Sequence, residues 1–313
     1  MMNACHRFRH GHTALPPAVA RPITVLTALV AILATVTLGS PTRAHAGSVE
    51  QACGTPLSAA EVDSIGRLSD TAALTGSALQ RLEQAVEQHR QITEILVRHR
   101  DRRGLLALGL NEVEQAAVMP LQRDPAAFDD PEWAHLISLD LLSRFLDSVH
   151  GEFTGAPVPA HWARYFELTR QCELSAARVA MAGYNAHLSV DLSYSVAAVR
   201  GTPANAPDYF KIVDAIARQG ELIVTSTKEI YGGDLGPLWR FYFLGEGLDA
   251  VLGEGVGTGQ LLRLADAGAN VVIFTNGLAL QDPALAPAVR LEIDALWRSA
   301  DVAFEVLTRL GGL

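Results

Sequence analysis

Apolar residues along most of this chain recur at intervals of three and four, which places them on one face of an α-helix. The clearest example lies between Thr75 and His99, where the apolar positions are Leu79, Leu82, Val86, Ile92 and Leu96. The same spacing, with the residues that bound each segment, predicts helices over 105–121, 131–150, 159–174, 175–200, 208–231, 237–252, 260–280 and 283–310. No convincing series alternates between apolar and polar residues, as half-buried strands would. The pattern therefore predicts an all-α fold, a single-domain bundle of about eight or nine helices.

Residues that start and stop helices support these boundaries. Ser58-x-x-Glu61 has the form of a capping box, which opens the first helix. Asp130 followed by Pro131 is an N-cap with proline at the first helical position. Glycines at every second position from 253 to 259 precede a helix, where backbone amides can bind an anion. Without a preceding strand or a Gly-Lys-Ser/Thr ending, this run is interpreted as a flexible connector.

The first 46 residues have the features of an export signal. Arginines precede an apolar run over residues 23–38, and Arg43-Ala44-His45-Ala46 ends in a small-x-small pattern. We expect a secretory signal peptide in residues 1–46, cleaved after Ala46, and a single all-α domain in residues 47–313. The apolar run is shorter than the roughly 20 residues of a membrane span, and a retained N-terminal anchor is the alternative. The protein is therefore predicted to be secreted or extracytoplasmic, with no integral membrane segment after signal cleavage.

Removal of the signal makes the protein more acidic. The signal holds four Arg and no acidic residue, so the formal net charge changes from −9 for the whole chain to −13. A strongly acidic protein repels polyanions at long range. Nucleic acid is therefore excluded as an expected partner, which leaves an unknown small-molecule ligand or no ligand at all.

Two cysteines remain in the mature chain, Cys53 and Cys172. In an oxidising compartment an even pair indicates one disulfide, whereas two separate thiols are the other interpretation of the same residues. The chain contains no Cys-x-x-Cys, so a redox motif is not indicated.

The most informative segment is residues 183–192. His187 and Asp191 are four apart, so an α-helix places them on one face, one turn from each other. Tyr184 extends the same stripe in a segment otherwise made of Ala, Met, Val and Leu. Polar groups are costly to bury unless they are paired, so the stripe indicates a site. The spacing suits two metal ligands from one helix turn, and it also suits an Asp that orients a catalytic His.

Spacing alone favours a structural interpretation, in which a buried His is hydrogen-bonded to its neighbour in a packing network. Chance gives about one His-x-x-x-acid pair in a chain with this many acidic residues, and the mature chain has one. A functional site would need further groups, and on the helix over 131–150 the residues Asp140, Arg144 and Asp147 stack on one side. We expect Asp140 to be the first of these to face the site. The nearby histidines His135, His150 and His161 are interpreted as incidental.

Residues 128–216 resemble an uncharacterised all-helical family of bacterial, largely actinobacterial, proteins, a domain of unknown function. The specific part of the resemblance is the core Asn-Ala-His-Ile/Leu-x-x-Asp-Leu, present here as Asn185-Ala-His187-Leu-Ser-Val-Asp191-Leu192. Weaker pieces are Asp130-Pro131, Leu139-Asp140, Pro159-Ala-His-Trp162 and Asp208-Tyr209-Phe210. The resemblance implies Asn185, His187 and Asp191 as site residues and brings no substrate with it. This chain departs from the family at Ser193, where the family tends to have proline.

Two hypotheses follow, and whether the protein is an enzyme stays open between them. The first is an exported, hydrolase-like enzyme with His187 and Asp191 as catalytic residues and with Asn185, Tyr184 and Asp140 in binding roles. A divalent metal such as zinc, ligated by His187 and Asp191, is one form of it. This form rests on a distant likeness to the helical zinc-dependent phospholipase C and single-strand nuclease group. The second hypothesis is a non-catalytic helical binding or structural module in which the His/Asp motif is a buried packing network.

Overall fold

The computed structural model describes residues 49–235, 261–309 and 313, with the backbone alone over 261–267. Within these ranges every regular element is a helix, which confirms the predicted all-α class. The described residues belong to one compact unit, residues 45–313. The predicted signal peptide, the predicted helix over 237–252 and the glycine run at 253–259 lie outside the described residues.

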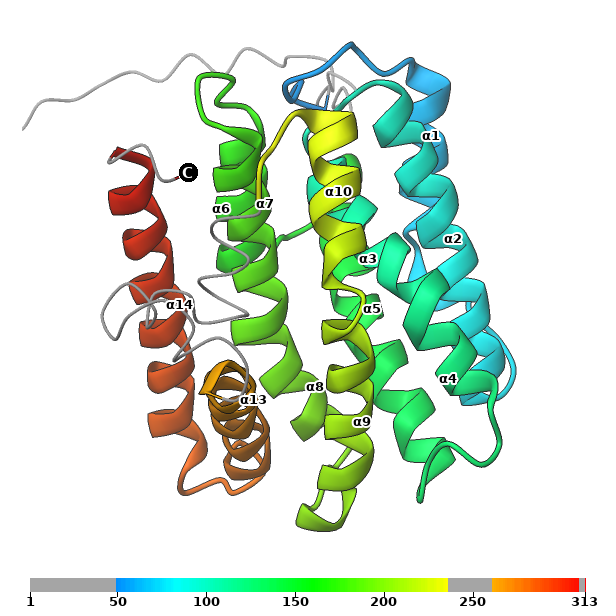
Figure 1. Cartoon of the computed structure of the whole chain (residues 1–313). Helices are drawn as coiled ribbons and strands as arrows, with labels where there is room; N and C mark the ends of the chain where they lie inside the picture. Colours follow the sequence, from blue (N-terminus) through cyan, green and yellow to red (C-terminus); the bar gives the residue numbers. More distant parts are fainter. Residues whose placement is uncertain (1–48, 236–260, 310–312) are drawn as a thin grey trace, which may run out of the picture. The chain divides into compact units, whose positions relative to one another are not determined.

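From α1 to α10, and again from α13 to α14, the described helices follow one another along the chain with short connections (Figure 1). The first half contains α1 (Ala59–Leu68), α2 (Ala78–Arg98), α3 (Gly104–Val113), α4 (Met119–Arg123), α5 (Pro131–Thr154) and α6 (Ala160–Thr169). The second half contains α7 (Ala176–Asn185), α8 (Leu192–Ala198), α9 (Ala206–Ala217), α10 (Gly220–Tyr231), α13 (Leu261–Ala279) and α14 (Ala286–Arg309). Two π-helices, Glu114–Val118 and Ala186–Asp191, join α3 to α4 and α7 to α8. Single 3₁₀ turns occupy Thr71–Ala73 and Pro203–Asn205. Three of the predicted helices are thus divided, the ones over 105–121, 175–200 and 208–231.

Helix α2 packs against α3 and α5, and α10 covers α3 (Figure 1). On the other side of the fold, α13 packs on α8, and α14 packs on α7 and on the π-helix that follows it. The main core is centred on aromatic side chains of α5 and α6, with Phe145, Trp162, Tyr165 and Phe166 all buried. A small separate cluster around Trp297 and Ile293 attaches α14 to Val190. The segment predicted to carry the site therefore lies between the main core and α14.

The predicted capping box at Ser58 and the predicted N-cap at Asp130 are confirmed. The Ser58 hydroxyl accepts from the Glu61 amide, and a Glu61 carboxylate oxygen accepts from the Ser58 amide at 2.9 Å. That backbone donor, with the Ser58 hydroxyl and His99, lowers the pKa of Glu61 to about 2. Asp130 caps α5 by accepting from the Trp133 amide at 3.1 Å, and Pro131 occupies the first turn, where no amide donor is needed.

Two glycines allow α3 and α7 to cross closely. A Cβ atom at Gly109 of α3 would lie 1.7 Å from the Tyr184 hydroxyl oxygen of α7. A Cβ atom at Gly183 would lie 3.0 Å from the side chains of both Leu106 and Tyr165. A side chain at either position would force these neighbours to shift, so the close crossing fixes the end of α7, directly before the His187 segment.

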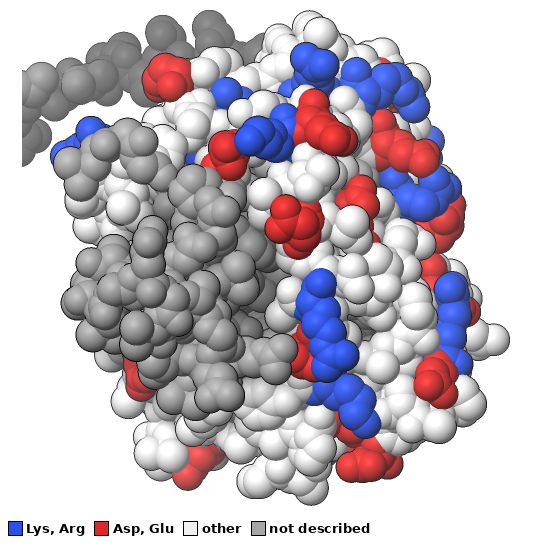
Figure 2. All heavy atoms as spheres, viewed as in Figure 1, with Lys and Arg blue, Asp and Glu red and all other residues white. Residues whose placement is uncertain are grey.

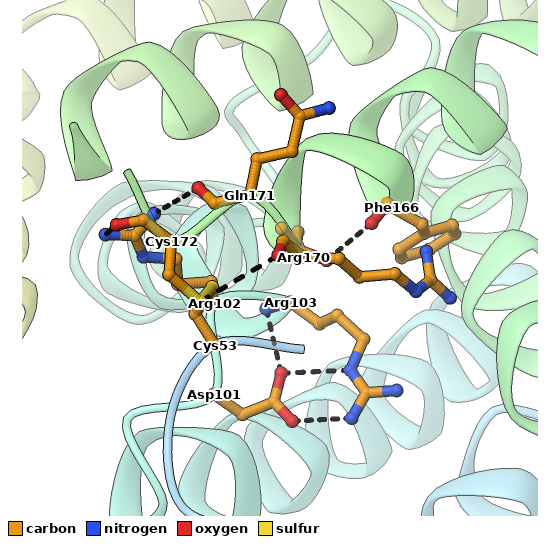
Figure 3. The surroundings of a disulfide bond; sticks show 9 residues. Cys53, Asp101, Arg102, Arg103, Phe166, Arg170, Gln171 and Cys172 are labelled. Carbon is orange, nitrogen blue, oxygen red and sulfur yellow. Dashed lines mark hydrogen bonds and ion pairs between the residues drawn. A yellow bond between two sulfur atoms is a disulfide. The ribbon is translucent and has the colours of Figure 1, made fainter. Parts of the chain in front are cut away.

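A disulfide joins Cys53 to Cys172, as one interpretation of the sequence predicted (Figure 3). It ties the segment before α1 to the turn after α6 across a sequence separation of 119 residues. Backbone hydrogen bonds accompany it, because the Cys53 amide donates to the Thr169 carbonyl at 3.0 Å and its carbonyl accepts from the Arg102 amide at 2.9 Å. The extended segment around Cys53 is therefore held to two separate parts of the chain.

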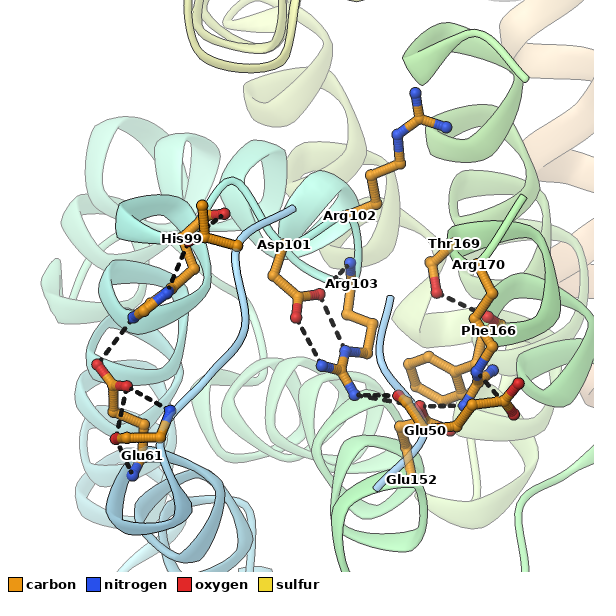
Figure 4. Close-up of polar contacts among 12 residues, drawn as sticks. Glu50, Glu61, His99, Asp101, Arg102, Arg103, Glu152, Phe166, Thr169 and Arg170 are labelled. Atoms are coloured by element: carbon orange, nitrogen blue, oxygen red, sulfur yellow. Dashed lines mark hydrogen bonds and ion pairs between the residues drawn. The ribbon is translucent and has the colours of Figure 1, made fainter. Parts of the chain in front are cut away.

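A buried cluster of ion pairs (Figure 4) lies beside the disulfide (Figure 3). Arg103 makes two parallel hydrogen bonds to Asp101, at 2.9 Å and 2.5 Å, and both side chains are almost completely buried. Glu152 accepts from Arg103 at 3.4 Å and from Arg170 at 2.5 Å. The guanidinium of Arg103 also lies 4.3 Å from the ring centre of Phe153. Because each buried charge has an opposite charge in contact, the cluster connects the start of α3 to α5 and α6 without an isolated buried charge.

Acidic and basic side chains are interspersed on the face of the molecule seen in Figure 2. Many form exposed pairs one helix turn apart, such as Arg90 with Glu87 and Arg218 with Asp214. Among the described helices, none is both long enough and apolar enough to cross a membrane.

Candidate functional site

The segment that carries His187 and Asp191 is a π-helix rather than a regular α-helix. It runs from Ala186 to Asp191 and leads directly into α8. A π-turn contains more residues than the 3.6 of an α-helix, so residues four apart do not stack as the sequence-based prediction assumed. His187 and Asp191 line two different cavities, which we name the His161 cavity, next to Asp191, and the His187 cavity.

Asp191 is buried, with 3% of its surface exposed, and it bonds to α6 rather than to His187. One carboxylate oxygen lies 3.0 Å from Nε2 of His161, and the other accepts from Nε1 of Trp162 at 2.9 Å. Both donors come from consecutive residues at the start of α6, so Asp191 fixes the position of that helix turn. The result is a His–Asp pair in which the carboxylate holds the imidazole in place.

The His161–Asp191 pair lies in the wall of a cavity of about 450 Å³ between α5, α6, the π-helix and α14. His161 is partly buried, and none of the described residues hydrogen-bonds to its Nδ1 atom. The cavity wall combines charged and aromatic side chains, namely Arg144, Asp147, His161, Asp191, Tyr194, Arg290, Asp294 and Trp297. Titratable groups that gather around a cavity are typical of a functional site, which makes this cavity a candidate within the part of the chain that the structure describes.

Arg144 and Asp140 on α5 form an ion pair one turn apart, with Nε of Arg144 2.6 Å from the Asp140 carboxylate. The same Nε atom donates to the Ser195 hydroxyl at 3.1 Å, and Nη2 donates to the Tyr194 carbonyl at 3.4 Å. Arg144 lines the His161 cavity, whereas Asp140 does not. Asp140 therefore does not face this cavity; its carboxylate bonds to Arg144, which does, and a binding role for Asp140 stays a prediction.

Two other charged residues complete this wall. Asp147 accepts from the Thr71 hydroxyl at 2.6 Å, and loss of water around it raises the pKa of its carboxyl group in spite of that bond. Arg290 on α14 is exposed, and within the described residues it has no ion-pair partner. The cavity thus offers a carboxyl group that holds its proton more strongly than usual and a guanidinium that is available to an anionic group.

His187 is buried in the His187 cavity, with 4% of its surface exposed. Its Nδ1 atom is inaccessible to solvent and has no hydrogen-bond partner, and no described residue hydrogen-bonds to Nε2 either. Burial lowers the pKa of His187 to about 4, an effect that Asp191 opposes and His89 reinforces. The imidazole is therefore neutral at physiological pH.

Asn185 and Tyr184, the other predicted binding residues, hold helices together. The Asn185 amide donates to the Trp297 carbonyl of α14 at 2.9 Å, and its oxygen accepts from the Ser189 hydroxyl at 2.7 Å. These bonds bring α14, and with it Trp297, against the π-helix. Tyr184 is buried against Gly109 at the helix crossing, and burial raises the pKa of its hydroxyl.

The sequence interpretation missed a second buried His–acid pair. His89 of α2 is fully buried, and its Nδ1 atom lies 2.7 Å from the carboxylate of Glu114, the first residue of the other π-helix. The sequence contained a signal, because His89 falls on the same apolar face of α2 as Leu82 and Val86. A titratable residue at a core position indicates a buried polar partner, and here that partner is Glu114.

The described donors do not suit a metal ion at His187 and Asp191. These two side chains line separate cavities, and Asp191 already accepts from two α6 donors. Across residues 49–235 and 261–309, no group of three or more His, Cys, Asp and Glu side chains is arranged to hold a metal ion. A protein zinc site normally needs at least three such ligands. His187 and Asp191 therefore do not form the predicted metal site within the described residues.

Replacing His187 with Leu is expected to raise the free energy of unfolding by about 1 kcal/mol at pH 7, because a buried imidazole without partners is costly to desolvate. The gain should grow as the pH falls from about 6.5 toward 4. Over that range the unfolded chain takes up a proton that buried His187, with its pKa near 4, does not, so the wild-type protein alone loses stability. Urea unfolding at pH 7 and pH 5 measures both effects.

Asn185→Leu is the matched control for this substitution. It removes a similarly buried polar side chain two residues away, but one that is fully bonded to Trp297 and Ser189. Because the Trp297 carbonyl and the Ser189 hydroxyl would lose their hydrogen-bond partner, the free energy of unfolding should fall by about 1–3 kcal/mol. A comparable loss in His187→Leu would instead indicate that His187 belongs to a packing network.

Comparison with known proteins gives a family and no activity. A family of unknown function, DUF5995, matches residues 82–251, more than half of the chain. The matched region includes every residue of the His161–Asp191 and His89–Glu114 pairs. No curated protein and no solved structure matches the chain.

Proposed function

The chain belongs to the family of unknown function DUF5995, and for this member we propose an exported, hydrolase-like enzyme in which His161, oriented by Asp191, is the general base. One observation carries the proposal: the 3.0 Å contact between His161 Nε2 and the Asp191 carboxylate, in the wall of a cavity of about 450 Å³. The predicted pair of His187 and Asp191 is replaced in this proposal by His161 and Asp191. Asp191 keeps its role, and the histidine comes from α6.

The contact decides which nitrogen of His161 carries the proton. A carboxylate can only accept, so the Asp191 oxygen calls for a proton on Nε2, and the neutral ring then has its lone pair on Nδ1. Trp162 satisfies the second carboxylate oxygen, which keeps Asp191 from turning away. His161 is thereby prepared to accept a proton at Nδ1, as a general base must.

Water is the nucleophile that fits this arrangement. Within the described residues, no Ser, Thr or Cys side chain hydrogen-bonds to His161, so none of them is a nucleophile activated by this histidine. In the proposed step, Nδ1 takes a proton from water while the water oxygen bonds to the electrophilic atom of the substrate. The bond to the leaving group breaks, and the proton on His161 passes to that group. Arg290 and Arg144 are placed to stabilise negative charge that develops in this step.

Export is part of the proposal and is supported by the disulfide. A bond between Cys53 and Cys172 persists in an oxidising compartment and is uncommon in the cytosol of most organisms. The proposed enzyme therefore acts on a small molecule outside the cytoplasm.

The test is hydrolysis of 4-nitrophenyl acetate, 4-nitrophenyl phosphate and 4-nitroacetanilide, which probe ester, phosphate and amide cleavage. His161→Gln should lower the rate on the accepted probe by about 10²–10⁴-fold, the usual contribution of a general base. The matched control is His135→Gln, which changes a partly buried histidine of α5 that bonds to the Gln122 carbonyl away from the cavity. That variant should keep the wild-type rate.

Two results would contradict the proposal that the protein is an enzyme with His161 as its general base. Equal rates in the wild type and in His161→Gln would remove His161 from catalysis. No cleavage of any probe by the wild type would favour the second hypothesis, a non-catalytic binding module. The aromatic walls that Trp297 and Tyr194 give the cavity are compatible with that function.

A further inference from the structure

The His187 cavity is a second, chemically different site. It measures about 120 Å³ and lies among α3, α5, the π-helix, α8, α9 and α10. Most of its wall is aliphatic, including Leu110, Val113, Leu141, Leu192, Ile212 and Ile223. No Asp, Glu, Lys or Arg belongs to the described wall, so a charged ligand would lose its hydration without gaining an opposite charge.

One polar group in this wall lacks the partner that burial normally requires. The Ser138 hydroxyl accepts from Gln122 at 2.9 Å, and the Tyr209 hydroxyl donates to Asn270 at 3.2 Å. His187 Nδ1, in contrast, is buried with no partner among the described residues. Leaving a buried polar atom unbonded costs about 1–3 kcal/mol, so its presence beside a cavity calls for a ligand that supplies the missing bond.

We infer that the His187 cavity binds a small, mostly apolar molecule that carries one hydroxyl group. A hydroxyl both donates and accepts, so it satisfies the neutral imidazole whichever nitrogen holds the proton. The volume fits a single ring, since an apolar cavity of roughly 150 Å³ in another protein binds benzene. Phenol is the simplest molecule with these properties. This inference does not depend on the activity proposed for the His161 cavity.

The test compares phenol with toluene, which has nearly the same shape and no hydroxyl, by isothermal titration calorimetry at pH 7. Both should bind the wild-type protein. In His187→Leu the ratio of the toluene to the phenol dissociation constant should fall about fivefold, the equivalent of one hydrogen bond of about 1 kcal/mol. The ratio is compared because it cancels the difference in hydrophobicity between the two probes.

A blocking variant and a spectroscopic measurement make the test independent of how His187→Leu folds. Val213→Trp places a large side chain at a partly buried position of the same wall and should abolish binding of both probes. In the wild type, phenol should shift the ¹⁵N resonances of the His187 ring, and toluene should leave them nearly unchanged. The inference is overturned if neither probe binds at millimolar concentration, if Val213→Trp binds as the wild type does, or if phenol and toluene respond alike to the loss of His187.

Discussion

Replacing both Cys53 and Cys172 with Ala should lower the free energy of unfolding by about 4–5 kcal/mol. The bond closes a loop of 119 residues, and a loop of that length loses a large amount of conformational entropy in the unfolded chain when its ends are joined. Because most single domains are stable by only about 5–15 kcal/mol, this loss is a large part of the total. Urea unfolding of the double variant beside the oxidised wild type measures it.

Reduction of the wild-type protein is the control for the double substitution. Dithiothreitol should move its unfolding midpoint to that of the double variant and should leave the variant itself unchanged. The native fold should persist in both cases, since backbone bonds to Thr169 and Arg102 still hold the Cys53 segment. A double variant within about 1 kcal/mol of the oxidised wild type would show that the cross-link hardly restrains the unfolded chain.

The helices could be predicted from the sequence because their determinants are local. Apolar spacing placed α2 within a few residues of its observed bounds, Ala78–Arg98. Caps are equally local, since a capping side chain bonds to amides within three residues of itself, as Ser58 and Asp130 do. The start of a helix whose first turn carries such residues can therefore be predicted from the sequence without knowledge of the fold.

The π-helices could not be predicted from the sequence in the same way. Residues 175–200 have apolar and polar positions compatible with one continuous helix, and nothing local marks the extra residue at Ala186–Asp191. The wider turn reflects what packs around it, with α6 on one side and α14 on another. The prediction that His187 and Asp191 stack on one face assumed a regular α-helix. The π-helix at Ala186–Asp191 therefore made this part of the predicted site wrong.

The hydrogen-bond partner of Asp191 could not be predicted from neighbouring residues, for a different reason. His161 lies 30 residues earlier in the chain and reaches Asp191 only because α6 packs on the π-helix. Its sequence context did contain a signal, since Pro159-Ala-His161-Trp162 supplies both donors of the Asp191 carboxylate. A histidine next to a tryptophan at a helix start offers two N–H groups to one buried acceptor, and that combination is the local signal for His161.

In the proposed mechanism, replacing Asp191 with Asn should lower the rate of hydrolysis by about 10³-fold while the protein stays folded. The Asn oxygen can still accept from Trp162, but its amide nitrogen donates and therefore faces His161 Nε2 as a donor. The ring can bond to it only with the lone pair on Nε2 and the proton on Nδ1. His161 then presents a donor to the cavity and cannot take a proton from water. The rate constant kcat/KM on the accepted 4-nitrophenyl probe and the ¹⁵N shifts of the His161 ring report the two consequences separately.

Asp208→Asn is the matched control, because Asp208 is equally buried and its carboxylate also accepts two hydrogen bonds, from the Asp129 and Asp130 amides. It does not line the His161 cavity, so its replacement should cost stability and leave the rate unchanged. A rate loss shared by both variants would point to a general loosening of the fold. A wild-type rate in Asp191→Asn, with the ¹⁵N shifts showing the proton moved to Nδ1, would mean that the Nδ1 lone pair of His161 is not the catalytic base. Asn and Asp have nearly the same size, so the comparison isolates the position of one proton from the packing around it.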